Sequence, residues 1–366
     1  MTVANKPLLG CFICSAIFFS WSSPLSAQEA NQQKLAITDV SKADQDFHVQ
    51  GEYLGDLGFR RRSRVGLGLQ VVALGDGQFE GVAYPGGLPG YGWNGEDKVS
   101  LSGSRSESVT DVTLILDSGK YQVHLKGPLA LVFSTEEQFL GSLHKIHRAS
   151  RTLHARPPRD AVILFNGQDA EQFENGRITE DGLLMTGTTT KLAVNDFHLH
   201  LEFRTPYMPS ARGQGRGNSG VYIQRRYEVQ ILDSFGLKGE HNECGGLYRQ
   251  HPPAVNMCLP PLSWQTYDIY FKAARWDKEN KKTANAVITV YHNGFPIHDQ
   301  QEITNKTGAG KPEGPEALPI HLQHHGNPVR FANVWIQPAP IASPSDVPGA
   351  ARKAPRRCRL LSIWHR

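Results

Sequence analysis

The chain has 366 residues, which at the usual ~100–200 residues per domain suggests two domains. Its 36 glycines, 23 prolines and hydrophobic content of 39% favour a turn-rich β protein, and no stretch keeps the apolar period of a long helix. The formal net charge is +4, but six basic residues and no acidic ones follow Val347. Without those six the charge becomes −2, which excludes a basic nucleic-acid-binding domain as the main fold.

The N-terminus has the pattern of a secretory signal peptide. Lys6 is followed by a mostly apolar run over residues 8–21, and then by small residues that end at Ala27. This pattern predicts a signal peptide over residues 1–27, cleaved near Ala27, and a secreted or periplasmic protein. The apolar run is too short for a membrane span. Residues 28–45 are expected to be a frayed polar lead-in.

Cleavage there would leave three cysteines, Cys244, Cys258 and Cys358. In an oxidising compartment, Cys244 and Cys258 are expected to form a disulfide across a proline-rich loop. A zinc site is the weaker alternative, because no second pair of ligands follows at zinc-finger spacing.

Residues 46–147 are expected to form a small β-sandwich or barrel, because short strand-like runs alternate there with turn residues. The seven runs cover residues 47–54, 65–73, 78–83, 98–103, 109–116, 120–125 and 131–134. We see no acid/base constellation in this accessory domain. Residues 148–159 are basic, contain Pro157-Pro158 and are predicted to be a linker.

A second β-domain is predicted over residues 160–338, followed by a basic, disordered tail over 339–366. Its opening run, 161–167, and its closing run, 329–336, are expected to pair with each other, as in many sandwiches. Asn293-Gly294 follows an alternating run and predicts a β-hairpin.

Polar and apolar residues alternate strictly in three runs of this domain, 198–204, 219–224 and 227–232. In a strand, successive side chains point to opposite faces. Each run therefore has one apolar face and one face of carboxylates, amides, guanidinium groups and phenols. A solvated antiparallel sheet would produce the same alternation. The polar groups suit a polyol, so a common sugar-binding face is the preferred interpretation.

Ordered motifs identify the second domain as similar to a known family. They are Leu164-Phe165-Asn166-Gly167, Gly217 to Tyr222, Tyr227 to Ser234, Cys244 to Tyr248, Trp264 to Asp268, His292-Asn293-Gly294 and His325 to Phe331. Together they resemble the 3-keto-disaccharide hydrolase family, also described as 3-keto-α-glucoside 1,2-lyase/3-keto-2-hydroxyglucal hydratase. The resemblance implies an all-β fold with a concanavalin A-like jelly-roll sandwich, and 3-keto-glucosides or 3-keto-disaccharides as substrates.

The implied chemistry is removal of the C2 proton beside the C3 carbonyl, loss of the C1 substituent, and hydration. It needs a base, an acid and a group that stabilises the enolate. Glu202 and Glu228 are the candidate base and acid, and Arg204 or His325 would stabilise the enolate. Ion pairing on a wet sheet is the structural alternative for either glutamate. The residues expected to contact the sugar are Asn218, Tyr222, Gln224, Gln230, Tyr248 and Asn256.

No cofactor is implied with certainty, although a divalent metal would assist the enolate. His321 and His325 share a predicted strand face, and His251 is a possible third ligand. The family often has Gln-Asp-His-Gly where this chain has Gln323-His324-His325-Gly326, which puts any role of that acid in doubt.

Two other functions remain open. The same fold carries non-catalytic sugar-binding modules, so the domain could bind without turnover. An ordinary glycan endo-hydrolase is the other alternative, but Gln230 stands where its second carboxylate would be expected. The sequence predicts no nucleic-acid partner and leaves the oligomeric state open.

Overall fold

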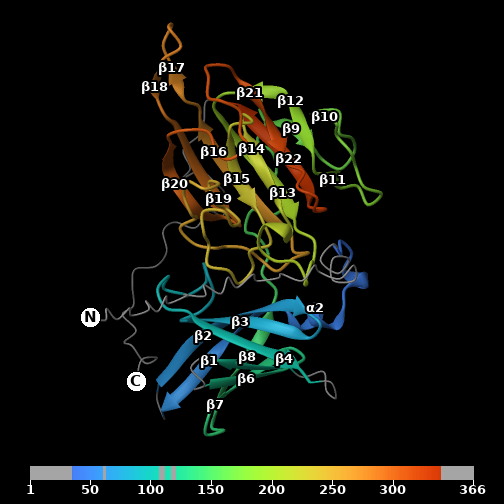
Figure 1. The fold of residues 1–366 in the computed structure, drawn as a ribbon, viewed down its shortest axis with the longest axis vertical. Coiled ribbons are helices and arrows are strands. Elements are labelled where there is room, and N and C mark those ends of the chain that lie inside the picture. The colour runs from blue at the N-terminus through green and yellow to red at the C-terminus, as the bar shows by residue number, and fades with distance from the viewer. Residues whose placement is uncertain (1–34, 61–62, 107–111, 117–120, 339–366) are drawn as a thin grey trace, which may run out of the picture.

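The computed structural model describes residues 35–60, 63–106, 112–116 and 121–338 (Figure 1). The predicted signal peptide and basic tail lie outside these residues. The helices in them are short: η1 (Val40–Lys42), α2 (Gln45–Val49) and η2 (Gly213–Gly215). Within the described ranges, no helix is both long and apolar enough to span a bilayer.

The first domain is a closed barrel of eight antiparallel strands in sequence order. It consists of β1 (Gly51–Arg60), β2 (Ser63–Gly75), β3 (Gln78–Pro85), β4 (Val99–Arg105), β5 (Val112–Leu116), β6 (Tyr121–Lys126), β7 (Leu129–Ser134) and β8 (Phe139–Ile146). β8 closes the barrel on β1, with Glu52 opposite Ile146. The predicted small β-domain is confirmed, but β8 was missed because Phe139 is exposed and Gly141 interrupts its apolar pattern.

The barrel core includes residues from the second domain. Tyr207 and Leu262 pack with the buried barrel side chains, including Tyr53 and Leu69. The lead-in also takes part, because the main-chain N–H of Ile37 donates to the carbonyl of Tyr207 at 3.0 Å. Ile37 is therefore held against Tyr207, contrary to the frayed lead-in expected over residues 28–45. The two domains share one apolar contact instead of being separate bodies on a free linker.

The second domain is a sandwich of two antiparallel sheets. The five-stranded sheet has the order β10 (Phe173–Glu174), β12 (Thr188–Val194), β21 (Leu318–Leu322), β14 (Ser219–Ile223), β15 (Tyr227–Ile231). The seven-stranded sheet has the order β11 (Leu184–Met185), β22 (Arg330–Pro338), β13 (Phe197–Arg204), β16 (Gln265–Lys272), β19 (Ala286–His292), β20 (Phe295–Ile303), with β9 (Val162–Phe165) also on β22. A small ribbon, β17 (Arg275–Trp276) and β18 (Lys282–Ala284), projects from one end (Figure 1).

Two local predictions are confirmed in the sandwich. The opening strand β9 pairs antiparallel with the closing strand β22. Asn293 and Gly294 join β19 to β20 with φ angles of 53° and 77°. Both angles are positive, as a type I′ hairpin turn requires. The jelly-roll expectation for this domain is thus met by two facing antiparallel sheets.

The apolar faces of the two sheets meet in one core. Leu199, Leu201 and Phe203 of β13 pack in the same buried cluster as Val221 of β14 and Val229 of β15. Because side chains alternate along a strand, the polar residues between them point away from this core. The polar face of β13 and the polar faces of β14 and β15 therefore lie on opposite sides of the sandwich.

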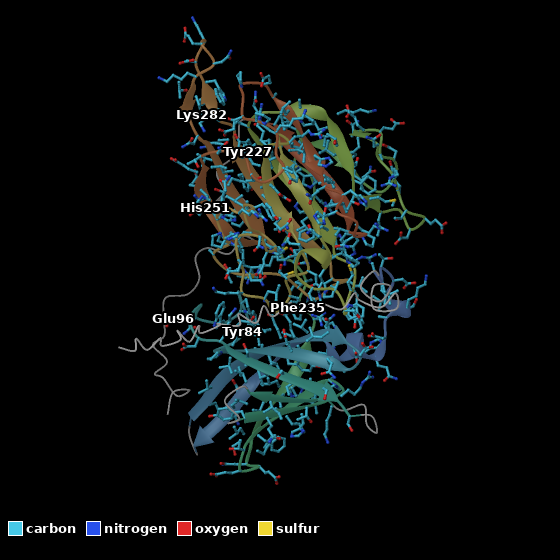
Figure 2. The ribbon with its side chains drawn as sticks, viewed as in Figure 1. Tyr84, Glu96, Tyr227, Phe235, His251 and Lys282 are labelled. Atoms are coloured by element: carbon cyan, nitrogen blue, oxygen red, sulfur yellow. The ribbon has the colours of Figure 1, made fainter. Side chains whose placement is uncertain are left out.

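The barrel holds the segment that leads into β14. The guanidinium of Arg212 donates to the carbonyl of Leu74 at 2.8 Å, and that of Arg216 donates to the carbonyl of Ala73 at 3.3 Å. Tyr84 of the barrel and Phe235 of the sandwich both lie near this junction (Figure 2). The accessory domain thus supports a chain segment next to the polar face of the five-stranded sheet.

Candidate active site

Polar side chains form a row across the outer face of the five-stranded sheet. Glu228 of β15 lies opposite Tyr222 of β14, Tyr222 lies opposite His321 of β21, and His321 lies opposite Thr189 of β12. His321 and Thr189 are also joined through Nδ1 and Oγ1 at 2.9 Å. The row brings together side chains from four strands, as expected for a binding face.

Glu228 is the central acid of this row. The Tyr222 hydroxyl donates to its Oε2 at 2.7 Å, and the main-chain N–H of Glu228 donates to Thr307 Oγ1 at 2.6 Å. Burial raises the pKa of Glu228 to about 7, against the lowering effect of the Tyr222 hydrogen bond. Only 2% of the residue is exposed. Among the described residues, none donates a hydrogen bond to its Oε1. Glu228 is therefore a candidate general base, with its Oε2 held by Tyr222.

Gly220 makes room for this carboxyl group. It lies opposite Gln230 on the neighbouring strand, and a Cβ added to it would stand 2.4 Å from Glu228 Oε1. The carboxyl group therefore lies over the glycine. Gly308 closes the other side, since its added Cβ would meet Tyr248 Cδ1 at 2.9 Å and Glu228 Oε2 at 3.5 Å. Because Gly220 and Gly308 have no side chains, the Glu228 carboxyl group has room between the sheet and the loop that follows Thr307.

Substituting Gly220 tests this arrangement. In Gly220→Ala the new methyl group displaces the end of the Glu228 side chain, because a flexible side chain moves more easily than a strand. We expect at least a ~10-fold loss of kcat/KM with a change in unfolding free energy below ~1 kcal/mol. Gly58→Ala in β1 is the matched control, since its nearest atom is 3.8 Å away. Unchanged kinetics in Gly220→Ala would remove Glu228 from the reaction.

An amide cluster adjoins the acid. It consists of Gln214 from η2, Asn218 just before β14, and Gln230 from β15. Gln230 Nε2 donates to Gln214 Oε1 at 3.0 Å, and Asn218 Nδ2 donates to the same oxygen at 3.2 Å. Asn218 and Gln230 are each 1% exposed, whereas Gln214 is half-buried. Asn218 and Gln230 were predicted from the sequence, but Gln214 was missed because it lies in no alternating run.

Glu202 and Arg204 are not in this site, which corrects their predicted role. Both project from β13 on the outer face of the seven-stranded sheet, with the apolar core between them and Glu228. Glu202 accepts from the main-chain N–H of His154 at 2.6 Å and from Asn333 Nδ2 at 2.9 Å. Arg204 lies over the Trp264 ring, 5.1 Å from its centroid, and donates to the carbonyl of Thr38. Both residues hold chain segments in place.

Three further predictions are corrected by the contacts observed. Gln224 has a φ of 49°, and its side-chain amide donates a hydrogen bond to the carbonyl of Val194. Asn256 donates to the carbonyls of Ser234 and Leu237, so it braces a loop. Cys244 and Cys258 are both free and buried, and the predicted disulfide is not formed.

The histidines proposed as metal ligands are not gathered together. His325 is exposed, and His251 Nε2 lies 3.3 Å from the amide nitrogen of Gln301 on β20. His324, at the position where the family often has an acid, contacts Thr186 Oγ1 through Nδ1 at 3.0 Å. Among the residues that the structure describes, no group of three or more His, Cys, Asp or Glu side chains could hold a metal ion.

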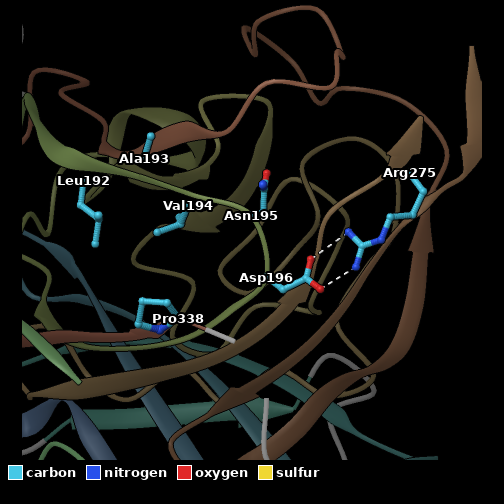
Figure 3. Close-up of a pocket in the computed structure, with 7 residues that line it drawn as sticks. All are labelled: Leu192, Ala193, Val194, Asn195, Asp196, Arg275 and Pro338. Carbon is cyan, nitrogen blue, oxygen red and sulfur yellow. Dashed lines mark hydrogen bonds and ion pairs between the residues drawn. The ribbon is translucent and has the colours of Figure 1, made fainter. Parts of the chain in front are cut away.

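A separate pocket of about 470 Å³ lies at another part of the sandwich (Figure 3). It is lined by Leu192, Ala193, Val194, Asn195, Asp196, Arg275 and Pro338. Asp196 and Arg275 form an ion pair at 2.5 Å there. None of the predicted site residues lines this pocket. The acid and the base that do line it, Asp196 and Arg275, are paired with each other. Glu228 and its neighbours are therefore the candidate site.

Comparison with known proteins places the second domain in a family. The sequence model described as the 3-keto-alpha-glucoside-1,2-lyase-like domain matches residues 160–337. The chain belongs to this family. The match covers the sandwich up to the last residue but one of β22, and it excludes the barrel. It therefore contains Glu228, Tyr222 and the amide cluster.

Two crystal structures of proposed glycosyl hydrolases from Parabacteroides distasonis are similar to the chain. The first is 32% identical to this chain, and the superposition has a TM-score of 0.46. The match covers 50% of this chain and 85% of the chain in the crystal structure. The second is 18% identical, with a TM-score of 0.38, and the match covers 53% of this chain and 98% of the chain in that structure. No curated protein matches the chain.

Proposed function

We propose that the protein is a carbohydrate-active enzyme that cleaves 3-keto-glycosides by elimination and hydration, with Glu228 as the base. The observation that carries the proposal is the Glu228 carboxyl group. It is buried, has a pKa of about 7, accepts from Tyr222 on Oε2, and sits among amides suited to a sugar. Membership of the 3-keto-alpha-glucoside-1,2-lyase-like family supports the keto-sugar substrate.

The reaction follows from the acidity that a C3 carbonyl confers on the hydrogen at C2. Glu228 takes the C2 proton, and the C2–H electron pair becomes the C2=C3 bond of an enolate. The enolate then reforms the C3 carbonyl while its C2=C3 pair becomes the C1=C2 bond. The C1–O bond breaks with its electron pair on the substituent oxygen, which is protonated as it leaves. Water adds across C1=C2, with its oxygen on C1 and a proton on C2. Tyr222 orients the carboxylate, and the phenol of Tyr248, on the other side of Gly308, is the acid that we propose for the leaving group.

The spacing of the two acids on the described strands of this sheet, Glu228 and Glu174, supports elimination over ordinary glycoside hydrolysis. Glu174 of β10 lies in the same cross-strand row, but three strands separate it from β15. At about 4.8 Å per strand the two carboxyls are on the order of 19 Å apart along the sheet. Retaining and inverting glycosidases need pairs within ~5–9.5 Å.

The test offers purified protein 3-ketotrehalose or 3-ketosucrose beside the unoxidised sugar. We expect monosaccharide release from the keto form alone, with solvent deuterium entering C2 of the remaining substrate. Binding of the keto-sugar without any release would instead identify a sugar-binding module. Equal release from the unoxidised sugar would identify an ordinary glycosidase. We also propose that this chemistry takes place outside the cytoplasm, on the basis of the N-terminal signal pattern.

A further inference from the structure

The buried amides of Asn218 and Gln230 both donate to Gln214 Oε1. Main-chain carbonyls fix which end of Asn218 and of Gln214 is the nitrogen. Asn218 Nδ2 donates to the main-chain oxygen of Gln214 at 2.7 Å, so its nitrogen end is assigned. Gln214 Nε2 donates to the carbonyl of Asn242 at 2.7 Å, which is also an acceptor only. Gln214 therefore turns its Oε1 toward the other two amides, and Gln230 must present an N–H to it.

The buried oxygen ends of two of these amides, Asn218 Oδ1 and Gln230 Oε1, have no hydrogen-bond donor among the residues that the structure describes. Among the described residues, the Gln230 side chain makes one hydrogen bond, to Gln214 Oε1. A buried amide with so few partners costs stability, so a structural role alone does not account for the pair. Two N–H groups that converge on one oxygen are, in contrast, the arrangement that stabilises an oxyanion.

The two donors are close to the proposed base. Gln230 follows Glu228 by two residues on the same strand face, and it lies opposite Gly220, over which the Glu228 carboxyl group rests. In a 3-keto-glycoside the acidic hydrogen on C2 is adjacent to the C3 oxygen. A base at Glu228 and two donors at Gln230 and Asn218 therefore match the two neighbouring reacting groups.

Gln214 is placed to leave this position. It is half-buried between two glycines, Gly213 and Gly215, and a Cβ added to either would meet nothing within 4 Å. The arginines on either side, Arg212 and Arg216, are tied to barrel carbonyls. The Gln214 side chain can thus rotate toward solvent while the ends of its segment stay anchored.

We propose that the N–H groups of Asn218 and Gln230 form the oxyanion site for the enolate, and that Gln214 fills this site with its own side-chain oxygen until substrate arrives. This inference rests on the function proposed above. The C3 carbonyl oxygen replaces Gln214 Oε1 and accepts both N–H bonds. As Glu228 removes the C2 proton, the electron pair moves into C2=C3 and the C3–O π pair becomes the charge that the two donors hold.

Three variants separate the roles. Gln230→Met removes a donor without adding charge, and we expect kcat to fall about 100-fold with little change in KM, because the bond strengthens as charge develops. Asn218→Ala removes the other donor and is expected to lower kcat by a similar factor. It tests the proposal independently if Gln230→Met folds poorly. Gln214→Ala removes the occupant, so KM for the keto-sugar falls several-fold and kcat is retained. Gln224→Met, at a buried glutamine outside the site, is the matched control.

The outcomes also separate this inference from the proposed function. If the parent protein releases product from 3-keto-sugars but Gln230→Met and Asn218→Ala keep its kcat, the oxyanion assignment is wrong and the function stands. A loss of kcat in Gln214→Ala equal to that in Gln230→Met would show that Gln214 belongs to the reacting arrangement and is not a stand-in. If the parent protein processes no keto-sugar, the proposed function itself fails.

Discussion

Replacing Glu228 with Gln should abolish most activity while leaving the fold at least as stable as before. Glutamine keeps the shape and can still accept the hydrogen bond from Tyr222, but it cannot take a proton from C2. Loss of a general base typically lowers the rate by about 10²–10⁴-fold. Steady-state kinetics on a 3-keto-disaccharide measures this loss. In the parent protein, kcat/KM should fall as the pH drops below about 7, because the base must be deprotonated.

Stability should move in the opposite direction from activity. The folded pKa of Glu228 is raised from 4.5 to about 7, so its contribution to stability is complete below pH ~4.5 and is lost as the pH rises through ~7. Above pH 7 the parent protein therefore holds a buried carboxylate at a cost of at most about 3 kcal/mol. Glu228→Gln has no such cost, and chemical denaturation at pH 8 should find it more stable. A less stable, still active variant would contradict both assignments.

Alternation in the sequence identified the polar faces but could not say which sheet each strand joins. The runs 198–204 and 219–224 have the same period, and both were expected to face one sugar. A period of two residues places side chains on one face or the other, but it does not specify the partner strand. The structure puts β13 and β14 in different sheets, so Glu202 and Glu228 point away from each other.

Other parts of the site left little trace in the sequence. Gln214 lies in a short 3₁₀ turn between glycines, and its position depends on arginine contacts to the barrel. Gly220 fits the alternation, but only the structure shows that the Glu228 carboxyl group occupies the space of its missing side chain. The Asn293-Gly294 hairpin was predictable because it depends on local turn chemistry. The pairing of the opening and closing strands was predictable because it recurs in sandwiches.

The acids and histidines on the far side of the sandwich form a buried charge network instead of a reaction centre. His200 Nδ1 lies 2.8 Å from Asp268 Oδ1, and His200 Nε2 lies 3.7 Å from Glu202 Oε1. Trp335 stacks on the His200 ring, with centroids 5.1 Å apart, and donates through Nε1 to the carbonyl of Ala155 at 3.2 Å. The network thus fixes the segment that joins barrel and sandwich.

Charge accounts for the stability of this network. Burial by itself would lower the pKa of His200, but the hydrogen bond with Asp268 and the nearby charges of Asp268 and Glu202 raise it to about 9. Burial alone would raise the pKa of Asp268 and that of Glu202. Hydrogen bonds and charges from His198 and His200 hold the pKa of Asp268 below its usual range, and His200, Asn333 and the His154 N–H do the same for Glu202. A buried imidazolium is therefore held by two carboxylates, and removing one of them leaves charge without its partner.

Asp268→Asn should lower the unfolding free energy by about 3–5 kcal/mol, the typical cost of breaking a buried ion pair from one side. Thermal and denaturant unfolding measure the loss. Asp196→Asn, which breaks the partly exposed pair with Arg275, is the matched control and should cost at most ~1 kcal/mol. Below its unfolding temperature, Asp268→Asn should keep the parent kcat, because the network lies across the core from Glu228.

The pH dependence tests the same network without relying on one variant. Because the folded pKa of His200 is raised from 6.5 to about 9, its contribution to stability is complete below pH ~6.5 and is lost as the pH rises through ~9. The parent protein should lose up to about 3 kcal/mol over this interval from His200. In Asp268→Asn the raised pKa falls and most of that slope should disappear. An equal slope in both proteins would mean that His200 is neutral, and the proposed ion network would then be wrong.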